Sequence, residues 1–250
     1  MAGHSKFKNI QHRKGAQDKK RARVFSRLTK EIMVAAKMGL PDPDANPRLR
    51  TAILAARGQN MPKDNIDRAI KKSTDDGETT YEEMRYEGFA PGGVGVIIET
   101  LTDNRNRTAS AVRSAFSKAG GNLGETGAVS FMFDRLGAIG FKKEVGGGEA
   151  VFEAALEAGA SDVESDDEGH NIFCAMEDLN NVSAALEEAL GAPREVGIIW
   201  RANNNIAVEG DAAASVLKFI DALDELDDVQ NVYANFDIAD DVMETLSASA

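Results

Sequence analysis

The sequence predicts a multidomain α+β protein, in which an N-terminal three-helix domain precedes two ferredoxin-like α+β domains, the second inserted into the first. Apolar residues recur at helical spacing as far as about residue 73, and strands and helices alternate beyond residue 80. A complete βαββαβ series also lies between a ββαβ series and an αβ pair. The αβ pair is what the ββαβ series lacks to be complete. The expected domains are residues 1–77, residues 78–134 joined with 204–250, and the inserted residues 135–203.

The N-terminal domain begins with residues 1–17, which have neither helical nor strand periodicity and read as an extended arm. From about residue 18 an apolar stripe at helical spacing predicts a first helix, which Pro41 prevents from continuing. Asn46 followed by Pro47 is typical of a helix N-cap with proline at the first helical position, and a third helix is expected near Pro62.

The first α+β domain is expected to start with a strand at Met84 and Tyr86, followed by a type II turn at residues 90–93. Its other predicted elements are a strand at 94–101, a helix at about 105–119 and a strand with Val129, Phe131 and Phe133 on one face.

The inserted domain is predicted from alternating strand and helix patterns in residues 135–203. Its expected elements are strands near 136–142, 161–165, 171–176 and 195–201, and helices near 149–159 and 179–190. A short strand at 206–208, a helix containing Val216 and Ile220 and a strand at 232–238 then complete the first α+β domain.

Charge is distributed very unevenly along the chain. The whole sequence carries −12, yet residues 1–75 contain 18 basic and 7 acidic residues, a net +11, and the remainder carries −23. Closely spaced like charges repel, and a polyanion relieves that repulsion. We therefore expect nucleic acid to bind at the N-terminal end; a solvated face or a patch for anionic membranes are the alternatives. The expected binding residues are Lys6, Lys8, His12, Arg13, Lys14, Lys19, Lys20, Arg21, Arg23, Arg27 and Lys30.

A second group of charges lies at the start of the helix predicted at 105–119. Asp103 is expected to be its N-cap, but Arg105 and Arg107 in the first turn oppose the positive end of the helix dipole. A site that breaks a local rule is a functional candidate, so the two arginines form a candidate anion site. Alternatively, both pair with acidic side chains of the domain, such as Glu99 or Asp103.

Enzymatic catalysis is not expected. His4 and His12 lie in the arm, His170 is placed in a turn, and Cys174 alternates with Ile172 on a predicted strand, which indicates a core position. No nucleophile elbow, metal-ligand spacing or nucleotide-binding fingerprint is present, so neither metal nor cofactor is expected. One cysteine, no membrane-length apolar run and no apolar stretch behind Met1 predict a soluble cytoplasmic protein without a membrane partner.

Seven short motifs resemble the YebC/PmpR family. They are Met1–Lys6 (MAGHSK), His12–Lys14 (HRK), Asp42–Arg50 (DPDANPRLR), Asn60–Pro62 (NMP), Tyr86–Gly88 (YEG), Asp103–Thr108 (DNRNRT) and Gly120–Gly124 (GGNLG). A tryptophan common in the family after the opening motif is Phe7 here, which keeps an aromatic ring. The resemblance implies a cytoplasmic protein with a helical domain followed by two α+β domains.

The resemblance also implies a role in gene expression. Bacterial members are described as DNA-binding transcriptional regulators, and related proteins, including a mitochondrial translational activator of cytochrome oxidase subunit I, act on the ribosome and assist the synthesis of difficult peptide stretches. We therefore expect a DNA-binding regulator or, alternatively, a translation factor that contacts ribosomal RNA. A third hypothesis is a protein-interaction module in which the basic end is incidental.

Overall fold

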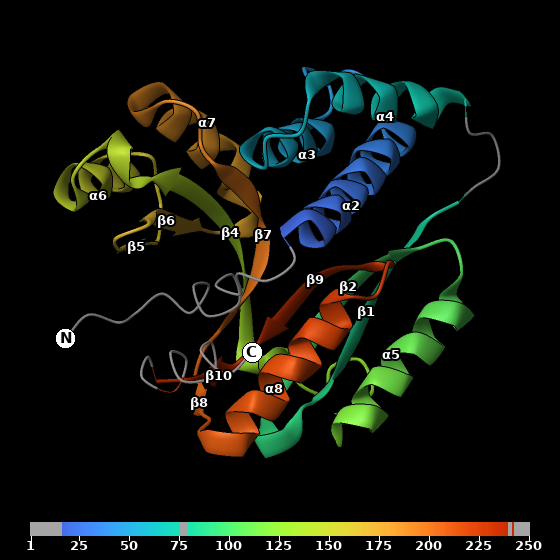
Figure 1. The fold of residues 1–250 in the computed structure, drawn as a ribbon. Coiled ribbons are helices and arrows are strands. Elements are labelled where there is room, and N and C mark those ends of the chain that lie inside the picture. The colour runs from blue at the N-terminus through green and yellow to red at the C-terminus, as the bar shows by residue number, and fades with distance from the viewer. Residues whose placement is uncertain (1–16, 76–79, 240–241, 243–250) are drawn as a thin grey trace. The chain divides into compact units, whose positions relative to one another are not determined.

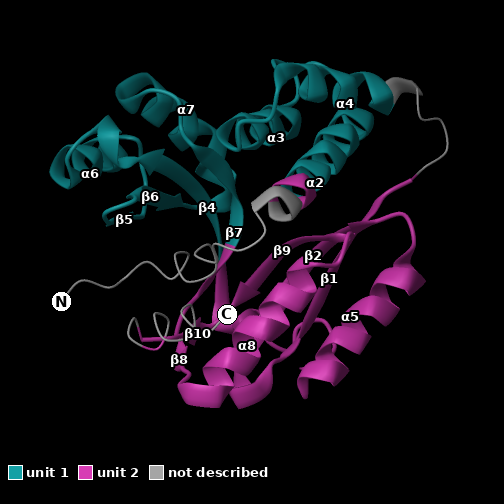
Figure 2. Cartoon of the chain, in the orientation of Figure 1, with its two compact units in different colours: residues 1–5, 24–77, 135–199 teal, residues 6–23, 78–134, 200–250 magenta. Residues whose placement is uncertain are grey.

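A computed structural model of the chain describes residues 17–75, 80–239 and 242 (Figure 1). The described residues form two compact units, shown in different colours in Figure 2. Those of unit 1 fall within residues 24–77 and 135–199, and those of unit 2 within 6–23, 78–134 and 200–250. Each unit is described by itself below.

Three helices build the N-terminal domain: α2 (Gln17–Met38), α3 (Pro47–Gly58) and α4 (Lys63–Asp75). As predicted, Asn46 caps α3 and Pro47 is its first residue: the Asn46 side chain accepts a hydrogen bond from the Leu49 N–H (3.1 Å). The Asn46 amide also donates to the carbonyls of Ala35 and Leu40, both at 2.8 Å, and so ties the end of α2 to the start of α3. The small core of the domain includes Ile32, Leu49, Ile53, Ala56, Met61 and Ile66.

The second domain is a four-stranded sheet with two helices on one face (Figure 1). Its strands lie in the order β3-β1-β2-β9, and each neighbouring pair is antiparallel. The rings of Phe116 and Phe219, one from each helix, meet edge to face with centroids 4.8 Å apart. The elements are β1 (Glu82–Phe89), β2 (Gly95–Thr102), α5 (Arg105–Ala119), β3 (Asn122–Leu123), α8 (Gly210–Asp224) and β9 (Val229–Ala234). A separate two-stranded parallel pair joins β8 (Ile206–Ala207) and β10 (Phe236–Asp237).

The turn between β1 and β2 has the predicted type II chemistry. Pro91 is followed by Gly92 with φ of 80°, a left-handed conformation that glycine adopts at little cost.

The remaining strands form the inserted ferredoxin-like domain. Its βαββαβ chain order and its sheet order β5-β6-β4-β7 are those of that fold, and its core includes Ile139, Phe141, Val151, Ile172 and Leu186. The elements are β4 (Phe133–Lys142), α6 (Gly148–Glu157), β5 (Asp162–Ser165), β6 (Gly169–Cys174), α7 (Leu179–Leu190) and β7 (Glu195–Ala202). The α+β fold class, with three helices followed by two sheet domains, is therefore confirmed.

One predicted strand is wrong. Residues 130–132 form a short 3-10 helix, the third strand of the second domain is only Asn122–Leu123, and Phe133 already begins β4 of the inserted domain. The alternation was misleading because Phe131 is 71% exposed, whereas Val129 and Phe133 are buried. The carboxylate of Glu87 accepts hydrogen bonds from the N–H groups of residues 129 and 130, both at 2.9 Å. Those donors are therefore not available to a strand ladder.

Candidate nucleic-acid interface

The predicted binding residues fall into three groups. Those of the arm, Lys6, Lys8, His12, Arg13 and Lys14, lie outside the described residues. Lys19 and Lys20 belong to the first turn of α2. The side chains of the last group are described: Arg21 is exposed, whereas Arg23, Arg27 and Lys30 are partly buried.

Arg23, Arg27 and Lys30 lie on one side of α2 because they are spaced by four and three residues. Ile32, Ala35 and Ala36 instead point into the helical core. Arg23, Arg27 and Lys30 are nevertheless only partly exposed. Long cationic side chains can bury part of their stems and keep their charged ends near water.

Intramolecular partners already engage several of these cations. Arg23 Nη2 lies 3.1 Å from Glu225 Oε1, with side-chain exposures of 40% and 61%. Exposed ion pairs of this kind contribute about 0–1 kcal/mol, so a phosphate can replace the carboxylate at little cost. Arg21, Arg27 and Lys30 also have interactions within the chain. A nucleic acid would bind this helix by exchanging partners.

Two arginines of the helical domain stabilise its fold. Arg48 makes a two-pronged contact with Glu31, Nε to Oε1 at 2.7 Å and Nη2 to Oε2 at 3.1 Å. Arg50 donates to the backbone carbonyls of Pro43 and Asp44 at 3.0 and 2.8 Å and closes the turn before α3. These side chains explain part of the basic excess without invoking a ligand.

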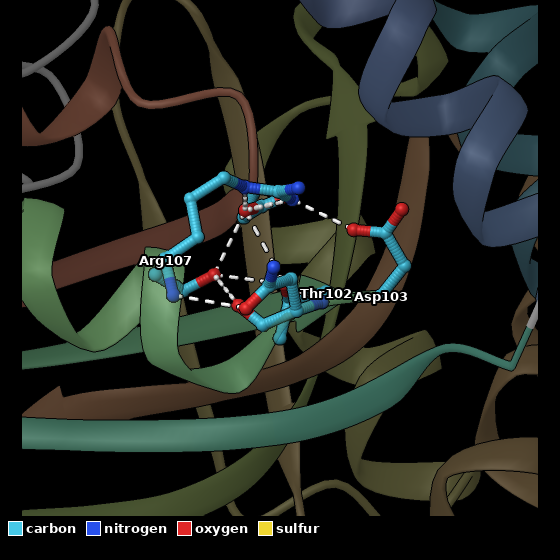
Figure 3. A network of polar contacts seen from close by, with 6 residues as sticks. Thr102, Asp103 and Arg107 are labelled. Carbon is cyan, nitrogen blue, oxygen red and sulfur yellow. Dashed lines mark hydrogen bonds and ion pairs between the residues drawn. The ribbon is translucent and has the colours of Figure 1, made fainter.

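The second predicted site is a network at the start of α5 (Figure 3). The N-cap is Asn104, which accepts from the Arg107 N–H at 3.0 Å, so the prediction of Asp103 was wrong by one residue. Thr102 explains the shift because its hydroxyl accepts from the Asn104 N–H at 2.9 Å and sets the backbone there. Asp103 instead pairs with the Arg107 guanidinium at 2.7 Å.

Asp228, which is 8% exposed, is the centre of this network. Its Oδ2 accepts from Arg107 Nη2 at 2.7 Å, from the Thr108 hydroxyl at 2.8 Å and from the Thr102 hydroxyl at 3.3 Å. Hydrogen bonds to Asp228 and Asp103 raise the pKa of the Arg107 guanidinium above its usual range. Arg107 is therefore held and neutralised by two carboxylates.

Arg105 differs from Arg107. It is 60% exposed and lies 3.5 Å from Glu82 in a loose surface pair. Glu99, which was considered as a partner of the arginines, instead accepts from Trp200 Nε1 at 2.9 Å and from Asn231 at 3.1 Å. The anion site stays a prediction, and its exposed cation is Arg105.

Two of the groups considered for catalysis, His170 and Cys174, lie in the inserted domain, whereas His4 and His12 lie outside the described residues. Cys174 is buried, as predicted, and burial raises the pKa of its thiol to about 11. His170 is in strand β6 and not in a turn; its Nδ1 accepts from the Ser165 hydroxyl at 2.7 Å and its Nε2 donates to the Gly146 carbonyl at 3.0 Å. No group of three or more His, Cys, Asp or Glu side chains suited to a metal occurs among the described residues.

Across that same part of the chain, every helix is too short or too polar to cross a membrane.

Comparison with known proteins covers most of the chain. Residues 5–76 match the TACO1/YebC protein N-terminal domain, and residues 81–236 match the TACO1/YebC second and third domain. A similar solved structure is the crystal structure of a conserved hypothetical protein, Aq1575 from Aquifex aeolicus. It is 45% identical with a TM-score of 0.83, and the alignment covers 92% of this chain and 96% of that one. The chain belongs to the TACO1/YebC family.

Proposed function

We propose that this protein is a non-enzymatic, nucleic-acid-binding regulator of gene expression, whose N-terminal basic residues bind the phosphate backbone. The observation that carries the proposal is the charge distribution, +11 in residues 1–75 against −23 in the rest of the chain. Family membership supports the same role.

Phosphate binding accounts for this distribution physically. Each phosphate neutralised by Lys or Arg releases counterions, which drives binding at low salt. The acidic remainder is repelled as a whole by the same polymer, so the main contact is expected at the basic end. Phosphate contacts position a protein without reading sequence, and they suit duplex DNA and structured RNA alike.

Our first candidate for the target is duplex DNA, which makes the protein a transcriptional regulator. A three-helix domain with basic residues on α2 is suited to lie against a duplex. The prediction is that the purified protein retards duplex DNA with sequence preference.

The second candidate target is ribosomal RNA, which makes the protein a translation factor that assists the synthesis of difficult peptide stretches. It is favoured by the partial burial of Arg23, Arg27 and Lys30, which makes these three side chains less suited to reading base edges in a groove. A basic end on an acidic body suits insertion into an RNA-walled cavity.

Crosslinking in cells, followed by sequencing of the attached nucleic acid, separates the two targets. Promoter DNA in the crosslinked pool supports the regulator and eliminates the ribosomal role, whereas ribosomal RNA does the reverse. Recovery of neither polymer above background contradicts the proposal as a whole.

A matched pair of variants tests which residues bind. Lys19→Glu/Lys20→Glu reverses two adjacent charges at the start of α2, where acidic residues suit the helix dipole, so we expect the variant to fold. Lys142→Glu/Lys143→Glu makes the same change at two exposed residues of the inserted domain. We expect the first variant to lose most crosslinking and the second to keep it; equal loss in both would show that net charge alone matters.

A further inference from the structure

We propose that the outer face of α5 is a second DNA-contacting surface, which rests on the proposed function and adds a contact outside the N-terminal domain. α5 contains four basic residues and no acidic residue. Residues 78–134 and 200–250 together contain 7 basic and 19 acidic residues, so outside α5 this sequence has only 3 basic residues against 19 acidic ones. The neighbouring helix α8 contains one lysine and three aspartates. Positive charge on this domain is thus concentrated on one helix.

The exposed face of α5 is continuous. Thr108, Val112 and Phe116 are buried on the inner side of the helix. The exposed residues of the outer side recur at helical spacing over about 18 Å. They are Asn106, Ser110, Arg113, Ser114, Ser117 and Lys118.

The network at Asp228 orients this face. Thr108 and Arg107 are fixed to Asp228 through hydrogen bonds of 2.8 and 2.7 Å, which anchors the first turn of α5 to the start of β9 (Figure 3). The guanidinium of Arg107 is already paired with Asp228 and Asp103, so we do not count it among the cations offered to a ligand. Arg113 and Lys118 make no ion pair with any residue in the described ranges, so their charges are available to a ligand.

The chemistry of the face favours a phosphate backbone over a protein partner. Serine hydroxyls, asparagine amides and arginine are the groups that contact phosphate and sugar in protein–DNA interfaces. Protein interfaces depend on buried aromatic or aliphatic anchors, and the exposed residues of this face include none.

The shape of the α5 helix favours duplex DNA over single strands and duplex RNA. The face has no aromatic ring on which a base of a single strand can stack. The major groove of B-DNA admits an α-helix, whereas the deep, narrow major groove of A-form RNA does not. We therefore assign Arg113 and Lys118 to phosphates that flank the major groove.

The test is the salt dependence of binding to a fluorescent duplex DNA, measured on the full chain. Arg113→Gln/Lys118→Gln removes two exposed charges, and Lys142→Gln/Lys143→Gln removes two exposed charges from the inserted domain as the control. Loss of two phosphate contacts makes the slope of log affinity against log salt shallower by about 1.8, so between 50 and 200 mM salt the wild-type affinity falls about 12-fold more than that of the α5 variant. The control keeps the wild-type slope.

Each other outcome overturns a defined part of the account. If the wild-type protein binds DNA but the α5 variant has the wild-type slope, the assignment of α5 fails and the proposed function stands. If the wild-type protein binds neither duplex DNA nor an RNA hairpin, the proposed function fails as well. If the α5 substitutions weaken binding to the RNA hairpin, or to polyglutamate as an acidic polypeptide, but leave binding to duplex DNA unchanged, the choice of duplex DNA is wrong.

Discussion

At the scale of single residues, Glu87 is the buried carboxylate with the clearest structural role. Its side chain has no exposed surface; it accepts from the N–H groups of Val129 and Ser130 and lies 2.9 Å from Arg85 Nε. Burial by itself would raise the pKa of Glu87, but hydrogen bonds from the backbone of residues 127, 129 and 130, together with the Arg85 charge, lower it below 4.5. The ionised form therefore stabilises the fold.

Stability should consequently depend on the protonation of Glu87. Because its folded pKa is depressed, the contribution is fully present above about pH 4.5 and is lost as pH falls through the folded pKa. Glu87→Gln should lower the free energy of unfolding at pH 7 by about 1–3 kcal/mol. The loss should be smaller near pH 3. Urea denaturation at both pH values, with the exposed Glu83→Gln as control, measures this; an equal loss at both values would contradict it.

Asp228 supports a second residue-scale prediction. Asp228→Ala leaves the Thr102 and Thr108 hydroxyls and the Arg107 guanidinium without their shared acceptor, and should cost about 1–3 kcal/mol of unfolding free energy. The exposed neighbour Asp227→Ala is the matched control. Denaturation midpoints that coincide for the two variants would show that the network does not stabilise the domain.

At the scale of elements, Asn46 connects two helices. Asn46→Ala removes the N-cap of α3, which alone costs about 0.5–2 kcal/mol, and also leaves the Ala35 and Leu40 carbonyls without their donor. Asn46→Ser keeps a capping oxygen and loses the amide donors, so its thermal unfolding midpoint should lie between those of the wild type and the alanine variant. A serine variant as unstable as the alanine variant would contradict a capping role.

Elements that depend on local signals were predictable. Regular apolar spacing and the Asn46–Pro47 pair located the three helices, and the βαββαβ order located the inserted domain. The strand expected at Val129–Phe133 was wrong because Glu87, more than forty residues earlier in sequence, binds the backbone there. The two-residue strand β3 is too short to produce a periodic pattern.

Parts of the candidate sites depend on distant residues in the same way. Arg107 and Asp228 are 121 positions apart on either side of the inserted domain, and no local pattern connects them. Asp103 and Asn104 are adjacent and both suit an N-cap, so the sequence likewise did not show which of them caps α5. The lack of acidic residues in 105–119, by contrast, can be read directly from the sequence.

At the scale of the whole molecule, charge is divided between a basic N-terminal end and an acidic remainder. If six basic residues of residues 1–30 engage phosphates, the slope of log affinity against log salt on duplex DNA should be about −5. Apart from the two contacts proposed for α5, the acidic body should add little to this slope, because it repels the polymer.

Equilibrium binding of the full chain to a labelled duplex DNA and to a ribosomal RNA fragment, titrated across salt concentration, shows whether the basic N-terminal end binds the phosphate backbone. We expect binding to at least one polymer at low salt, a steep negative slope, and a shallower slope for Lys19→Glu/Lys20→Glu than for Lys142→Glu/Lys143→Glu. A chain that leaves both polymers unbound at low salt would contradict this expectation.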